Sequence, residues 1–201
     1  MTANGESAWY NTNRGVMVVL KSKLKKTLGN FQSPYIISLA RLIETQSKAT
    51  LIQWCTGYAE KYIVPIYERA YPTDTRPQDA LHNAVGWLEG RVKFVDAKQT
   101  NYDAHAAATG AEGNYAAQAA ARACAHAALT IHVPAHCLGL AFYGTAALAY
   151  EQAGLNEAPE AYDRIAAVEC ARMEEALRGI AVCNESDPAK IDWKLWSYII
   201  K

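Results

Sequence analysis

The stretch from Tyr102 to Tyr150 constrains the fold of this chain more than any other part of the sequence. It is dominated by alanine, and it holds four of the five histidines of the chain: His105, His126, His132 and His136. Alanine has the highest helix propensity, and its small side chain lets two helix backbones approach closely. Histidine can ligate a metal, transfer a proton or change its charge near neutral pH. The stretch therefore predicts closely packed helices that hold either a functional pocket or a few hydrogen-bonded imidazoles.

Hydrophobic periodicity and the positions of proline and glycine predict helices along the rest of the chain. The expected helices cover residues 16–28, 34–44, 47–70 with a kink at Pro65, 75–89, 94–109, 114–150 with a break near Pro134, 159–182 and 188–200. Residues 16–20 also suit a strand, but the leucine spacing up to residue 28 favours a helix. Thr75 and Gln78 have the spacing of a capping box. No alternating pattern predicts a β-hairpin.

These elements predict an all-α fold, a single-domain bundle of about eight helices with an alanine-rich central helix pair. We expect a flexible N-terminus over residues 1–13 and one helical domain over residues 14–201. The chain has 20 basic and 20 acidic residues, and this balance argues against a nucleic-acid partner, which requires a basic excess. No apolar run is long enough to span a membrane. Five cysteines without a CxxC pair, and a polar start, predict a cytoplasmic protein.

The histidines leave a metal site open as an alternative. His132 and His136 are four residues apart, and His105 could complete a three-histidine set. The position after His132 is Val133, however, where a metalloprotease motif has glutamate, and Pro134 disturbs the helix. Cys124 and Cys137 lie near histidines in sequence but point to other helix faces. We therefore expect no metal, no cofactor and no catalytic residue, with the histidines as buried polar groups.

Asp74 and Arg76 form the sharpest polar motif outside the alanine-rich stretch. An aspartate near a helix N-terminus stabilises the helix dipole. The alternative is a polar patch, formed with Arg76, that contacts a partner or another helix.

Three segments together resemble the Imm-5-like family of bacterial immunity proteins. They are the segment from Trp54 to Gly90 with its Asp-Thr-Arg-Pro turn, the Asp-Ala-His-Ala-Ala-Ala segment, and the histidine-containing segment that follows. In the last two segments, the residues that match the family pattern are His105, His126, Thr130, His132, His136, Leu138, Gly139, Ala141 and Tyr143. The resemblance covers residues 53–149. It implies an all-α protein that neutralises a toxin used between competing bacteria, and it marks a polar cluster of Asp74, Arg76, His105, His126, His132 and His136.

From the resemblance we expect an immunity protein that binds a cognate toxin protein and is not an enzyme. The acidic side chains from Glu157 to Glu175 offer one candidate surface. The alternative is a helical hydrolase, or a metal- or small-molecule-binding protein, with a histidine-lined pocket. That alternative predicts that the four histidines converge. The face of small residues also leaves a homodimer open.

Overall fold

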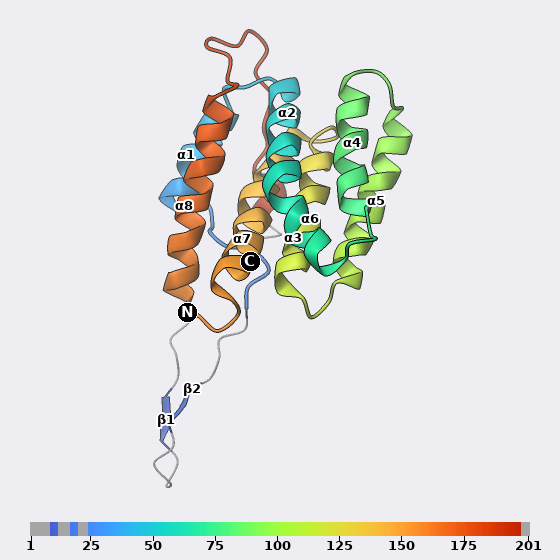
Figure 1. Cartoon of the computed structure of the whole chain (residues 1–201). Coiled ribbons are helices and arrows are strands. Elements are labelled where there is room, and N and C mark those ends of the chain that lie inside the picture. The colour runs from blue at the N-terminus through green and yellow to red at the C-terminus, as the bar shows by residue number, and fades with distance from the viewer. Residues whose placement is uncertain (1–8, 12–16, 20–23, 198–201) are drawn as a thin grey trace.

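The alanine-rich helix α6, Tyr115–Leu129, lies in the middle of the structure and contacts helices on several sides (Figure 1). The computed structural model describes residues 9–11, 17–19 and 24–197. Ten of the fifteen residues of α6 are buried, most of them alanines. Because a methyl group is the whole side chain, neighbouring backbones can approach α6 closely. The buried Asn101, for example, donates a hydrogen bond from its side chain to the carbonyl oxygen of Ala125.

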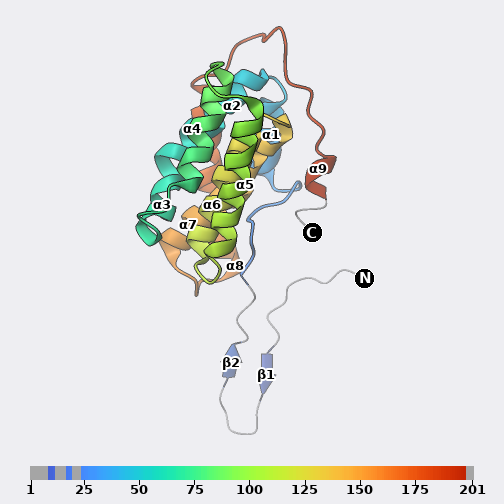
Figure 2. The same ribbon diagram turned by 90° about the vertical axis from the view of Figure 1, so that its right-hand side faces the viewer.

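The other helices surround α6. The α4–α5 pair (Arg76–Leu88 and Phe94–Gly110) covers one side, and α1 (Pro34–Ile43) packs on α8 (Pro159–Arg178) at the other side (Figure 1). Between them run α2 (Lys48–Tyr58), α3 (Val64–Ala70) and α7 (Thr145–Ala153). The short α9 (Lys194–Ser197) ends the described chain (Figure 2). The predicted all-α, single-domain bundle is confirmed.

Both predicted interruptions are present, in forms that the sequence did not specify. A π-helical turn, η1 (Ala59–Ile63), precedes Pro65, so the helix widens where proline lacks an amide donor and would clash with the preceding turn. After α6, the chain turns and continues as a 3-10 helix, η2 (Pro134–Cys137). A second π-helical turn, η3 (Leu140–Gly144), then leads into α7. The break near Pro134 is therefore confirmed.

The predicted helix over residues 16–28 is wrong in its described part. Met17–Val19 form strand β2, which pairs antiparallel with strand β1, Trp9–Asn11. This hairpin also contradicts the expectation of no strand pairing. Residues 24–33 are not helical, because long-range contacts hold the backbone: Leu28 N donates to Phe142 O at 3.1 Å, and Lys25 O accepts from the Tyr150 hydroxyl at 2.6 Å. Residues 1–8 and 12–16 lie outside the described residues, so the predicted flexible N-terminus stays a prediction.

The C-terminal helix is also shorter than predicted. Residues 188–193 are not helical, and α9 begins at Lys194. The buried Gln46 explains the difference, because its carbonyl oxygen accepts from Ala189 N at 2.8 Å and its side chain accepts from Val182 N at 2.8 Å. These bonds hold the segment after α8 extended across the end of α1. The helix predicted over 159–182 correspondingly stops at Arg178.

Candidate functional site

Three of the four histidines of the alanine-rich stretch meet in space. His105 comes from α5, His126 from α6 and His136 from η2. The ring centroids of His105 and His126 are 5.5 Å apart, and those of His126 and His136 are 5.2 Å apart. Close packing of α5 and α6 makes the first contact possible, and the turn at Pro134 brings His136 back over α6. We call these three residues the histidine cluster.

The histidine cluster is a neutral pair with a third imidazole beside it. His126 Nδ1 and His136 Nδ1 are 3.1 Å apart, so one nitrogen carries the proton and the other accepts it. Burial lowers the pKa of His136 to about 4 and lowers the pKa of His126 well below its usual value, and the neighbouring histidines add to both effects. Burial also lowers the pKa of His105, with a contribution from the charge of Arg122. The arrangement therefore favours uncharged imidazoles at neutral pH.

Aromatic side chains fill the space around the histidine cluster. The Tyr143 ring stacks on His126 with centroids 5.0 Å apart and an interplanar angle of 10°. Trp196 of α9 lies 5.1 Å from the ring of His126, is fully buried, and donates from Nε1 to Ala135 O at 2.7 Å. Gly139 leaves room for this packing, because a Cβ there would lie 2.9 Å from the Trp196 ring. Tyr143 and Trp196 therefore cover His126, whereas His105 is only partly buried.

His132 does not join the histidine cluster. Its side chain is exposed and lies against Phe94, with ring centroids 5.7 Å apart. The HxxxH spacing that suggested a shared helix face fails because the chain turns between His132 and His136. Within residues 9–11, 17–19 and 24–197, no group of three or more His, Cys, Asp or Glu side chains is arranged to hold a metal ion. The alternative set of His105, His132 and His136 therefore has no geometric support.

Asp74 and Arg76 hold the turn between α3 and α4. The Asp74 carboxylate accepts from Arg76 Nε at 2.8 Å and Nη2 at 2.6 Å, and from the Tyr67 hydroxyl at 2.6 Å. The hydrogen bonds from Arg76 lower the pKa of Asp74 to about 2. The predicted capping box is wrong, because the Thr75 hydroxyl donates to Asp79 Oδ2 at 2.8 Å and makes no cap hydrogen bond. In place of Thr75, the Asp74 side chain accepts a hydrogen bond at the start of α4, from Arg76 N at 3.2 Å.

The cysteines beside the histidines are protonated, buried thiols. Burial raises the pKa of Cys124 and Cys137 well above the usual value, and both side chains are fully buried. A thiol acts as a nucleophile through its thiolate, so this environment opposes that chemistry. Among the described residues, no carboxylate accepts a hydrogen bond from the histidine cluster, as it would to orient a general base. The geometry of the cluster is that of a packed polar contact between helices.

The acidic face proposed for α8 is interrupted. Asp163 accepts from the Tyr35 hydroxyl, Glu174 accepts from the Ser38 hydroxyl, and the buried Glu169 accepts from Gln152. Arginine side chains of the same helix pair with Glu169 and Glu174. Half of the six acidic side chains from Glu157 to Glu175 thus serve contacts within the fold, which weakens this face as a candidate surface for the toxin.

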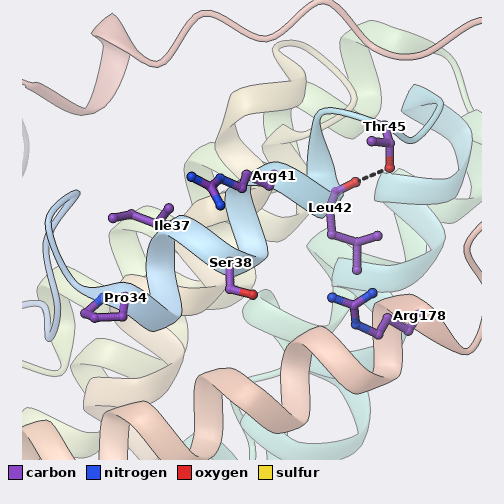
Figure 3. Close-up of a pocket in the computed structure, with 7 residues that line it drawn as sticks. All are labelled: Pro34, Ile37, Ser38, Arg41, Leu42, Thr45 and Arg178. Carbon is purple, nitrogen blue, oxygen red and sulfur yellow. Dashed lines mark hydrogen bonds between the residues drawn. The ribbon is translucent and has the colours of Figure 1, made fainter.

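A groove that no sequence pattern indicated lies between α1 and the end of α8 (Figure 3). The groove has a volume of about 520 Å³, and arginines from both helices, Arg41 and Arg178, line it. These residues are far apart in the sequence and belong to no motif. Only the packing of α1 on α8 brings them to one surface.

Comparison with known proteins places the chain in a family. The family model described as "Imm-5 like putative immunity protein" matches residues 41–176. This match is longer at both ends than the resemblance recognised in the sequence, which covers residues 53–149. No curated protein and no solved structure matches. None of the described helices has the length and apolar character to cross a membrane.

Proposed function

Because the chain belongs to the Imm-5-like immunity protein family, we propose that it binds and neutralises a cognate bacterial toxin without catalysing a reaction. The family match over residues 41–176, which is most of the chain, carries this proposal. We place the encounter in the cytoplasm of the cell that needs protection. Inhibition is steric: the helical surface covers the toxin's active site or the path of its substrate.

The interior of the bundle supports binding over catalysis. The histidine cluster is packed against Tyr143 and Trp196, and the thiols of Cys124 and Cys137 are held protonated. Groups arranged in this way stabilise helix contacts. We therefore assign His105, His126 and His136, with the Asp74–Arg76 turn, to the frame that holds the binding surface in shape.

A rigid frame suits a protein inhibitor. Binding costs least when the interface residues are already held in their bound arrangement, and tight interfaces of standard size bury about 1,600 Å² in total. Close packing around α6 supplies this rigidity, because its ten buried residues leave little room for rearrangement.

Co-expression with the toxin domain encoded beside this chain's gene tests the proposal. We expect the chain to restore the growth of bacteria that produce the toxin, and an immunity protein of another family to leave them unprotected. With purified proteins, a complex should elute from size-exclusion chromatography with equimolar composition. Absence of both rescue and complex contradicts the proposal.

Titration separates a binder from an enzyme. A stoichiometric inhibitor stops reducing toxin activity once one equivalent has been added, and the end point does not change with time. If a small fraction of an equivalent inactivates all the toxin during prolonged incubation, the chain modifies its partner, and the non-catalytic part of the proposal is wrong.

A further inference from the structure

The groove between α1 and α8 combines apolar walls with two positive charges. Ile37 and Leu42 of α1 supply apolar surface, and Ile37 is 36% exposed. Arg41 lies at one side and Arg178 of α8 at the other, and Figure 3 shows Arg178 opposite Leu42. None of the described residues that line this part of the groove is acidic, although Glu174 bonds to two of them, Ser38 and Arg178. Its lining is therefore cationic and apolar together.

The two arginines differ in how they are held. Arg178 pairs with Glu174, which also accepts from the Ser38 hydroxyl at 3.0 Å. This arrangement fixes the guanidinium between the two helices. Arg41 is exposed and makes no ion pair within the described part of the chain. One guanidinium is thus preorganised, and the other carries a charge that no described carboxylate neutralises.

The groove continues past the end of α8. A second hollow of about 710 Å³ shares Leu42, Thr45 and Arg178 with the first, and the extended chain after α8 lines it. Val182 in that segment is 48% exposed. The hollow therefore lengthens the groove, and the acidic residues Glu44 and Glu185 also line this second part.

Most of this lining lies outside the family match. The family match covers residues 41–176. Ile37 and Ser38 lie before it, and Arg178 and Val182 lie after it. An immunity protein must distinguish its own toxin from others, and the discrimination requires side chains beyond a shared frame. Arg41, Leu42 and Thr45 lie inside the match, so the groove combines residues of the matched segment with residues from outside it.

We propose that the groove receives a segment of the cognate toxin in which a carboxylate side chain is flanked by apolar residues. The carboxylate binds Arg41, the groove arginine without an ion pair among the described residues, and the apolar neighbours pack on Ile37 and Leu42. A planar guanidinium can hold a carboxylate through two hydrogen bonds, and arginine is among the residues that dominate binding energy at protein interfaces. This inference rests on the proposed function, because the toxin supplies the segment.

The test compares Arg41→Glu with wild type in binding to the toxin domain encoded beside the gene, measured by calorimetry. We expect Arg41→Glu to bind roughly 30-fold more weakly, with the loss growing at low salt. Arg178→Gln, which removes the second charge without reversing it, should also weaken binding. The matched control is Arg164→Glu, the same reversal at an exposed residue of α8 outside this groove. Circular dichroism confirms the fold of each variant.

Labelling of a cysteine tests the same groove without changing the charge of the protein. Cys183 lines the second hollow and is exposed, whereas the other four cysteines are buried. Maleimide should therefore label Cys183 in the native protein, and bound toxin should slow labelling at least tenfold. Cys183→Ser provides the background rate.

Four results overturn the inference. If wild type binds the toxin but Arg41→Glu binds equally well, the groove is not the site, and the proposed function stands. If Cys183 is labelled as fast in the complex as in the free protein, the groove is again not the site. If wild type does not bind at all, the proposed function fails and the inference fails with it. Loss of a homodimer in Arg41→Glu, with toxin affinity unchanged, would assign the groove to a second copy instead.

Discussion

Replacing Trp196 by alanine should destabilise the whole bundle, although Trp196 lies close to the C-terminus. The indole is fully buried against His126 and Phe142, with ring centroids 5.1 and 5.3 Å away. Truncation of a buried tryptophan costs about 3–5 kcal/mol through lost burial and the cavity left behind. This range includes the loss of the hydrogen bond from Nε1 to Ala135 O, which by itself contributes about 1 kcal/mol.

The expected loss in the free energy of unfolding is therefore about 3–5 kcal/mol, a large part of the 5–15 kcal/mol that holds a typical domain. The loss in the free energy of unfolding reaches about 3–5 kcal/mol only if α9 unfolds together with the bundle. If α9 detaches alone, the loss cannot exceed the free energy of docking that short segment. Urea denaturation followed by far-UV circular dichroism measures the loss, and an unchanged m-value shows that both proteins unfold the same surface.

Trp193→Ala is the matched control. Trp193 is only partly buried, and its Nε1 donates to an exposed carboxylate, Glu44 Oε1, at 2.6 Å. We expect its loss to be about 1 kcal/mol. If Trp196→Ala costs no more than Trp193→Ala, then Trp196 does not hold the histidine cluster in place, and the reasoning fails.

Three further predictions concern charge and reactivity. The pKa of His136 is lowered to about 4, so the unfolded chain binds protons first as pH falls below about 6.5, and the free energy of unfolding should decrease towards pH 4. In urea titrations His136→Gln should remove about 1.4 kcal/mol per pH unit from that slope, and an unchanged slope would contradict the shift. Asp74→Asn should lower stability by about 1–3 kcal/mol by thermal denaturation, because the bidentate pair with Arg76 is lost. A thiol reagent should react quickly with one cysteine, Cys183, in the native protein and with five after denaturation; a second fast thiol would contradict the burial of the others.

Local chemistry explains which helices could be predicted. The helix predicted over 94–109 and the first part of the helix predicted over 114–150, up to its break near Pro134, match α5 and α6 closely, because glycine, proline and Asn114 act on residues three or four positions away. Asn114 caps α6 by accepting from Ala117 N at 3.1 Å, as its position indicates. The failures at residues 24–28 and 188–193 share one cause, whereas Met17–Val19 pair with the nearby strand Trp9–Asn11. In both segments the backbone bonds with residues more than a hundred positions away, such as Phe142 and Gln46, and helical spacing carries no information about such partners.

The candidate site shows the same division. The sequence identified His105, His126 and His136 as unusual, and the structure brings them together. The sequence could not show that His132 lies away from the other three histidines, because the turn at Pro134 changes the direction of the chain. Nor did any pattern connect Trp196 or Arg41 with function, since the partners of both lie on helices distant in sequence.

The sequence by itself determined that alanine-rich helices form the centre, where they break, and which family the chain belongs to. These properties depend on residue type and on spacing within one or two helical turns. Only the tertiary structure decided that Trp196 packs on the histidine cluster and that Arg41 and Arg178 share a groove. Such contacts depend on how whole helices cross, and the crossing is set by the summed packing of side chains over the entire bundle.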